Sequence, residues 1–262
     1  METPKYWKKQ EKPLYSDLTW NLPEQKSGSI SVIGGNSQSF SIVNRTSTKL
    51  SRDFPIRDVI SVLPDSLKHS IPPIPGIIFC PSTTSGGFAK SSEITHALAS
   101  SDYNLLIGDF SRNSETSVAI SDAVVATDKP TIICRDTIDL LTSDMSRIVE
   151  KENIILICSM AQLQKVFRAV YYPKVLLLSM PVLPVIEALH KFTLSYPCTI
   201  LTFHEGLILT AKNGDIVSTK LTMTHYSPIS LWDGTLAADI AGIHLYNPSK
   251  PLESATAATI FD

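Results

Sequence analysis

Short apolar runs alternate with longer stretches in which apolar residues recur every three or four positions along most of this chain. Runs of this length are typical of strands that are buried on both faces of a parallel sheet. The predicted strands are Ser29–Gly34, Asp58–Leu63, Gly76–Cys80, Asn104–Gly108, Pro130–Cys134, Ile154–Cys158 and Val175–Leu178. The predicted helices between them include Lys90–Ser101, Ser114–Thr127, Met160–Val170 and Leu183–Leu194. This alternation favours βαβ units and a three-layer α/β fold with a mostly parallel central sheet.

The last third of the chain has a different pattern. Cys198–Thr202, Gly206–Lys212 and Asp215–Thr222 are predicted to be consecutive antiparallel strands. The dipeptide Asn213-Gly214 between the last two is a strong hairpin signal, because both residue types tolerate positive φ. The chain then closes with two predicted helices, Asp233–Tyr246 and Pro251–Ile260.

The first 28 residues show no clear period and place aromatic residues among charges. We predict an extended arm, residues 1–28, that lays these aromatics on the body of the protein or on a neighbouring subunit. The second arrangement would make the protein a homo-oligomer. Because no Gly/Ser/Pro-rich linker divides the remainder, residues 29–262 are predicted to form a single domain.

Composition narrows the range of partners. The formal net charge is −2 and the sequence pI is about 6.3, which argues against nucleic acid as a main partner. No apolar run reaches the roughly 18 residues of a membrane-spanning helix. The N-terminal residues lack the apolar core of a signal peptide, so we expect a cytoplasmic protein without a membrane partner.

The four cysteines and six histidines show no metal-ligand spacing. Each cysteine stands at the start or end of an apolar run, which predicts buried thiols at strand ends. No transition-metal site is therefore expected.

One aspartate stands where a helix could bind an anion. Asp233 lies just before the helical run that starts at Thr235, and the first turn of a helix offers free N–H groups at the positive end of its dipole. A carboxylate at this position either caps the helix or takes a proton from a substrate hydroxyl.

The segment from Ser230 to Gly242 resembles the Gly-Thr-Gly-Asp helix start of ribokinase-like enzymes, and is closest to the ATP- or ADP-dependent NAD(P)H-hydrate dehydratases. The resemblance implies a ribokinase-like fold, ATP or ADP with Mg²⁺, phosphoryl transfer to a hydroxyl and elimination that restores NAD(P)H. It implies that Asp233 is the base and that the N–H groups of Gly234 and Thr235 hold the transferred phosphoryl group. Trp232 stands where the family has a glycine beside the phosphate.

Three further segments resemble the substrate side of that family. The turn of Gly34, Gly35 and Asn36 is similar to its Gly-Gly-Ser turn, although an ordinary strand-to-helix turn would have the same composition. Gly108, followed by Asp109 and Asn113, stands at its Gly-Pro-Gly-Leu-Gly turn. Asn113 falls at the start of the next predicted helix, whose hydroxyl and acidic residues Ser114, Glu115 and Thr116 would also cap it.

Two more positions complete the predicted substrate site. Asp136 matches the second aspartate of the family's Asp-Ala-Asp-Ala-Leu segment, and Gln162 stands at the glutamate of its His-Pro-Gly-Glu segment. The carboxyl ends of parallel strands meet at one edge of a sheet, so these residues are expected to lie together.

Several family features are absent. Phe203 replaces the phosphate-facing lysine, and His204 either supplies charge in its place or is an exposed hairpin residue. The chain has only 11 glycines, and the missing ones are largely those that let backbone wrap around phosphates. Two functions therefore stay open. The protein is an enzyme like the dehydratases or a sugar-type kinase, or it binds a nucleotide or metabolite, or acts as a scaffold, without turnover.

Overall fold

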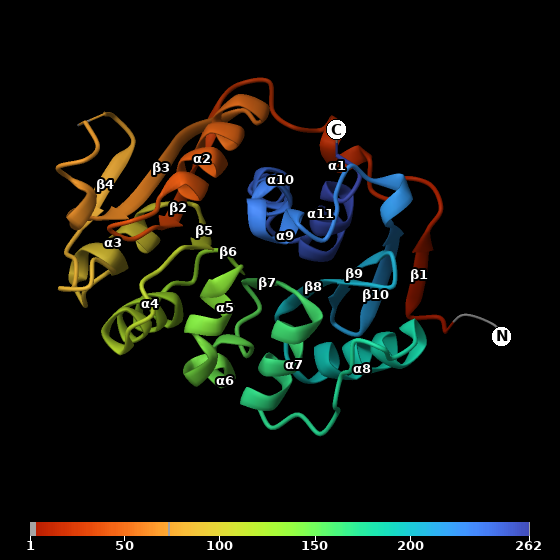
Figure 1. The fold of residues 1–262 in the computed structure, drawn as a ribbon. Coiled ribbons are helices and arrows are strands. Elements are labelled where there is room, and N and C mark those ends of the chain that lie inside the picture. Colours follow the sequence, from red (N-terminus) through yellow and green to blue (C-terminus); the bar gives the residue numbers. More distant parts are fainter. Residues whose placement is uncertain (1–3, 73, 262) are drawn as a thin grey trace.

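The computed structural model describes residues 4–72 and 74–261. In this part of the chain one sheet of ten strands runs through the molecule, with helices on both of its faces (Figure 1). The spatial order is β1-β10-β9-β8-β7-β6-β5-β2-β3-β4, and all neighbours are parallel except the β8–β9 and β9–β10 pairs. The strands are β1 (Trp7–Gln10), β2 (Ser27–Gly34), β3 (Ile56–Pro64), β4 (Ile77–Cys80), β5 (Tyr103–Gly108), β6 (Thr131–Cys134), β7 (Ile154–Cys158), β8 (Thr199–His204), β9 (Leu207–Lys212) and β10 (Asp215–Lys220).

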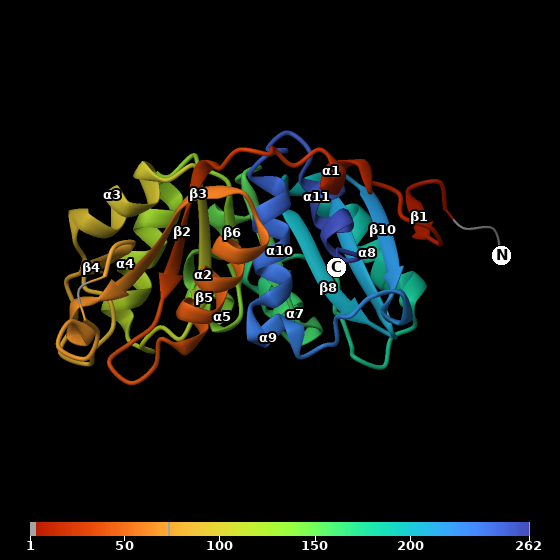
Figure 2. The same cartoon turned by 90° about the horizontal axis from the view of Figure 1, so that it is seen from above.

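Helices form two layers around this sheet. The helices are α1 (Asp17–Trp20), α2 (Ser41–Asp53), α3 (Ser92–Ser100), α4 (Ser114–Ala126), α5 (Asp136–Leu140), α6 (Met145–Ile148), α7 (Met160–Ala169), α8 (Val182–Ser195), α9 (Ser230–Asp233), α10 (Thr235–His244) and α11 (Pro251–Ala258). Figure 2 shows α2, α10 and α11 lying over one face, and Figure 1 shows α3 to α8 on the other. The fold is therefore the predicted three-layer α/β fold.

Alternation along the central strands divides the core into two parts. Val32 and Leu105 pack with α2 and α10, whereas their neighbours Ile33 and Leu106 pack with the helices of the opposite layer. Successive side chains of a strand point to opposite faces, so a strand with helices on both sides must be apolar throughout. This is why the parallel strands appear in the sequence as short unbroken apolar runs.

The hairpin predicted at Asn213-Gly214 is confirmed. β9 and β10 are joined by these two residues, and Asp215 pairs with Lys212 across the turn. Asn213 has φ of 50° and Gly214 has φ of 82°, the double positive φ that a type I′ turn requires.

The prediction of a strand at Val175–Leu178 is wrong. These residues belong to the loop between α7 and α8, and Leu178 is 81% exposed while Leu176 is buried. The neighbour of β7 in the sheet is instead β8, which pairs with it in parallel. An apolar run of four residues carries no information about whether a partner strand is available, so the sequence pattern misplaced the strand.

The N-terminal residues lie on the body of the same chain. β1 pairs in parallel with β10 at one edge of the sheet. Tyr6 stacks on His190 at a ring-centroid distance of 3.7 Å, and the indole N–H of Trp7 donates to the Ser218 hydroxyl at 2.8 Å. Residues 4–10 therefore add a strand to the sheet, and the aromatic side chains of Tyr6 and Trp7 hold that strand to α8 and β10.

Candidate functional site

Most of the residues predicted for the substrate side lie together at the carboxyl ends of β2, β5 and β6. The backbone N–H of Gly35 donates to the Gly108 carbonyl at 3.0 Å, and the Asn36 amide donates to the Asp109 carbonyl at 2.6 Å. The N–H of Asp109 donates in turn to the Asp136 carboxylate at 3.0 Å. Three strand ends are thus joined into one polar edge.

Two glycines allow this close approach. A Cβ on Gly34 would lie 2.4 Å from the Gly108 carbonyl oxygen, which is far inside van der Waals contact. Gly108 has φ of 89°, and a Cβ there would lie 2.1 Å from the Asp136 carboxylate. The glycines retained at these positions therefore have a structural reason that is independent of any ligand.

Sequence reasoning missed a central residue of this edge, Arg135. Its guanidinium donates to the Ile107 carbonyl at 3.0 Å and to the Asp109 carboxylate at 2.9 Å. Both Arg135 and Asp109 adopt left-handed backbone, with φ of 57° and 59°. The sequence signal for Arg135 was its place directly after a buried strand and before Asp136. Burial raises the pKa of the Asp136 carboxyl, and the hydrogen bond from Asp109 opposes that shift.

Gln162 and Asn113 take part in the N-terminal caps of two helices. Gln162 forms a capping box with Ser159 at the start of α7, and its side-chain amide donates to the Arg135 carbonyl at 2.7 Å. Asn113 caps α4, because its side-chain oxygen accepts from the Thr116 N–H at 2.7 Å. Both amides are thus engaged within the protein.

The predicted anion-binding helix begins later than the sequence pattern indicated. Gly234 adopts φ of 79° and separates the short helix α9 from α10, which begins at Thr235 and ends at His244 rather than at Tyr246. The N-cap of α10 is Gly234, so the expectation that Asp233 takes this position is wrong. Asp233 is the last residue of α9, and its carboxylate accepts from the Thr235 N–H at 2.9 Å. A Cβ on Gly234 would lie 2.6 Å from the Thr46 hydroxyl and 3.2 Å from the Ile107 side chain, so this helix start lies against α2 and the end of β5.

An apolar cavity of about 510 Å³ lies beside this helix start. Leu231 and Trp232 line it from α9, and Phe203 lines it from the end of β8. Trp232 is 41% exposed, so part of its ring is free to contact a ligand. The remaining lining residues are Ser159, Met160, Ala161, Leu178, His204, Glu205, Gly206, Leu221 and Pro228.

The expectation that His204 is an exposed hairpin residue is wrong. Its side chain is buried, and its Nε2 lies 2.7 Å from the Met180 carbonyl oxygen. A carbonyl oxygen only accepts, so Nε2 carries the proton of this hydrogen bond. His204 thus fixes the loop before α8 to the end of β8, a role that its sequence position did not indicate.

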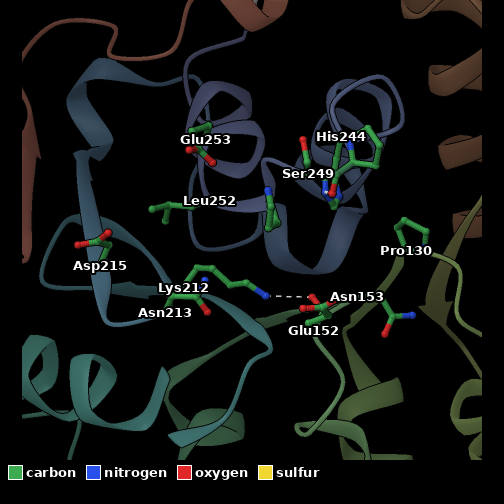
Figure 3. A pocket seen from close by; sticks show the side chains of 12 residues that line it. Pro130, Glu152, Asn153, Lys212, Asn213, Asp215, His244, Ser249, Leu252 and Glu253 are labelled. Carbon is green, nitrogen blue, oxygen red and sulfur yellow. Dashed lines mark hydrogen bonds between the residues drawn. The ribbon is translucent and has the colours of Figure 1, made fainter. Parts of the chain in front are cut away.

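A second, more polar pocket of about 380 Å³ opens at the opposite edge of the sheet (Figure 3). Lys212 lines it, and its ammonium group donates to the Glu152 carbonyl at 2.9 Å and also to the Pro197 carbonyl. Burial lowers the pKa of Lys212. None of the residues predicted for the site lines this pocket, so the candidate site is the edge at the carboxyl ends of the parallel strands.

Replacing Asp233 separates capping from any other role. Asparagine keeps a side-chain oxygen that can accept from the Thr235 N–H, so Asp233→Asn should leave the melting temperature nearly unchanged. Asp233→Ala removes the acceptor of the Thr235 N–H and should cost about 1 kcal/mol, the net contribution of one hydrogen bond. Urea unfolding of both variants measures the difference. Equal stability of the two variants would show that the carboxylate contributes nothing to the start of α10.

Comparison with known proteins shows the fold. No family model matches the sequence, and no curated protein matches it. Among solved structures, a ribokinase-like superfamily protein from Enterococcus faecalis aligns over 99% of this chain and 87% of its own, with a TM-score of 0.67 and 13% identity. The chain therefore has a ribokinase-like fold.

Two enzymes share this architecture. The ADP/ATP-dependent NAD(P)H-hydrate dehydratase of Bacillus subtilis, co-crystallised with ATP and Mg²⁺ and soaked with CoA, covers 92% of this chain and 83% of its own, with a TM-score of 0.58 and 14% identity. Pyridoxal kinase of Bacillus subtilis, solved as an ADP complex, covers 90% and 89%, with a TM-score of 0.51 and 11% identity. The resemblance to the ribokinase-like proteins and the hydrate dehydratases is thus confirmed at the level of the fold.

The described residues lack two features that would indicate other partners. None of the helices formed by residues 4–72 and 74–261 has the length and apolar character to cross a membrane. The same residues contain no group of three or more His, Cys, Asp or Glu side chains placed to hold a metal ion.

Proposed function

We propose that this protein binds a nucleotide or a related metabolite at the carboxyl-end edge of its sheet, with little or no phosphoryl transfer. The observation that carries this proposal is the apolar cavity between α9 and the end of β8. An apolar cavity with a few polar groups at its rim is typical of a small-molecule site. Trp232 and Phe203 offer aromatic faces on which a planar base could stack.

The residues around the start of α10 fit a phosphate chain poorly. The Asp233 carboxylate already accepts from the Thr235 N–H, so its negative charge stands at the position that an anion would need. Phe203 is buried, and the sequence resemblance places it at the position of the dehydratases' lysine. We therefore assign no role to Mg²⁺ or to a γ-phosphate in this protein. The catalytic alternatives, a hydrate dehydratase or a sugar-type kinase, would need Asp233 released from its hydrogen bond with the Thr235 N–H.

Ligand-dependent stabilisation tests the proposal. ATP, ADP, AMP, NADH and NADPH are added to the protein with and without Mg²⁺, and the melting temperature is recorded. A ligand at 100 times its Kd stabilises by about 2.7 kcal/mol. We expect AMP to stabilise as much as ATP does, because the cavity favours the base over the phosphates, and we expect Mg²⁺ to add little.

A pair of tryptophan variants controls this experiment. Trp232→Ala should abolish the stabilisation, whereas Trp20→Ala should retain it, because Trp20 is 85% exposed on α1 and does not line the cavity. Tight binding of magnesium-ATP, with turnover that Asp233→Asn abolishes, would contradict the proposal and favour the enzyme. Stabilisation by none of the five compounds would leave the scaffold alternative.

A further inference from the structure

Arg135 and Asp109 form an ion pair from backbone conformations that are unfavourable for residues with a side chain. Each residue has φ near 60°, and Arg135 also has ψ of −143°, a combination that belongs almost only to glycine. A residue with a side chain is strained in such a region, and strain of this kind clusters at ligand-binding sites. Glycine would make the same turn after β6 without strain. The turn itself therefore gives no reason for an arginine at position 135, which leaves the guanidinium group as the reason.

The hydrogen bonds of this guanidinium are incomplete. Its Nη1 donates to the Ile107 carbonyl and its Nη2 to the Asp109 carboxylate, but the buried Nε has no hydrogen-bond partner. In an arginine, Nε–H and one N–H of Nη2 point in the same direction and together bind a carboxylate or phosphate through two parallel bonds. Asp109 uses only one half of this pair. A buried donor without a partner destabilises the folded protein.

The position of the Asp109 carboxylate allows an oxyanion of a ligand to replace it at Arg135. One carboxylate oxygen accepts from Arg135, and the other accepts from the Ser39 hydroxyl at 3.1 Å. The Asp109 side chain is about one-fifth exposed, so it can turn towards solvent. An oxyanion that binds both Nε and Nη2 would satisfy the donor that Asp109 leaves unpaired.

We propose that Arg135 recognises an oxyanion of the ligand, a phosphate or a carboxylate, and that Asp109 occupies its place in the free protein. This inference rests on the proposed function, because it assumes that a ligand enters the same edge. Ile107 links the two regions: its carbonyl accepts from Arg135, and its side chain lies against Gly234 at the start of α10. In this proposal the positive charge for the oxyanion comes from Arg135, after β6, rather than from position 203 in β8.

Three variants test the competition between Asp109 and the ligand. Inorganic phosphate, ADP and succinate are titrated by calorimetry into the wild type, Asp109→Asn, Arg135→Lys and Asp58→Asn. Asparagine tolerates the left-handed backbone of position 109 but removes the competing charge. We expect Asp109→Asn to bind the preferred oxyanion about tenfold more tightly and Arg135→Lys about tenfold more weakly, since lysine has no planar fork. Asp58 pairs with Arg57 on the surface and is the matched control.

A structural ion pair predicts a different result. Asp109→Asn and Arg135→Lys would then both lose stability, and the two variants would not shift the affinity for phosphate or succinate in opposite directions. This result overturns the inference. A measurement on the wild type avoids dependence on variant folding. The Nε–H resonance of Arg135, recorded by NMR during a titration with phosphate and with succinate, must shift with one of them. A resonance that stays fixed in both titrations overturns the inference as well.

These outcomes separate the two proposals. If ADP binds the wild type with an affinity that neither variant at 109 or 135 alters, the oxyanion inference is wrong and nucleotide binding stands. If phosphate or succinate shows the opposite effects of the two variants while no nucleotide binds, the inference stands and the nucleotide proposal fails. A preference for phosphate or for succinate identifies which oxyanion the ligand carries.

Discussion

Replacing Lys49 by methionine should lower the free energy of unfolding by about 3–5 kcal/mol at pH 7, because it leaves a buried carboxylate without its cation. The Lys49 ammonium lies 2.7 Å from Asp239 and 3.0 Å from Asp53. Asp239 is fully buried on α10, and its other oxygen accepts from the Tyr226 hydroxyl. This cluster joins α2 to α10, the helix whose start forms part of the candidate site.

The effect of Lys49→Met should depend on pH with a defined sign. Burial raises the pKa of Asp239 even in the presence of Lys49. A raised pKa means that the folded protein holds the proton more tightly than the unfolded chain does, so the contribution of this group is favourable below the unfolded pKa and is lost as pH rises through the folded pKa. Removing Lys49 raises that pKa further. The deficit of the variant should therefore be largest near neutral pH and shrink as pH falls.

Chemical unfolding at several pH values measures this deficit. Adding Asp239→Asn to Lys49→Met should recover much of the loss, because no buried charge remains. Lys90→Met is the matched control: Lys90 lies 2.7 Å from Asp122 at the surface, where an exposed pair contributes about 0–1 kcal/mol. A loss no larger in Lys49→Met than in Lys90→Met would show that the ion pair between α2 and α10 is dispensable.

His244 should make the protein less stable as pH falls from about 6.5 to about 4. Its imidazole is buried at the end of α10, where it lines the polar pocket of Figure 3. Nε2 donates to the Pro248 carbonyl at 3.2 Å, and Nδ1 accepts from the Tyr103 hydroxyl at 2.9 Å. Burial lowers the pKa of His244 to about 4. The neutral ring therefore matches its hydrogen-bond partners and its buried environment, whereas the charged ring does not.

The sign follows from proton binding. Between pH 4 and 6.5 the unfolded chain binds a proton at this histidine and the folded protein does not, so acid favours unfolding. The stabilisation is complete above pH 6.5 and is lost as pH falls through 4, at about 1.4 kcal/mol per pH unit and about 3 kcal/mol in total. Urea unfolding across this range should show the slope in the wild type and a smaller slope in His244→Asn. The exposed His96, replaced in the same way, is the control. An unchanged slope in His244→Asn would contradict the assignment.

The sequence by itself determined the layers of this protein and one of its turns. Parallel strands with helices on both faces must be apolar along their whole length, so six of the seven apolar runs predicted as parallel strands were visible without a structure. The Asn213-Gly214 turn was also a local matter, because positive φ at two consecutive positions restricts the residue types that fit. The motifs at Gly34-Gly35 and Asp233 were enough to indicate a ribokinase-like fold.

The tertiary structure decided the rest, because it depends on neighbours that are distant in the sequence. Val175–Leu178 lies in a loop since β8 takes the place beside β7. His204 is buried because the loop before α8 covers it. Arg135 became a candidate for ligand recognition only when its guanidinium was seen to reach from the end of β6 to Asp109 at the end of β5. Side-chain burial and hydrogen-bond partners are set by the packing of whole layers, and no local pattern of residues specifies them.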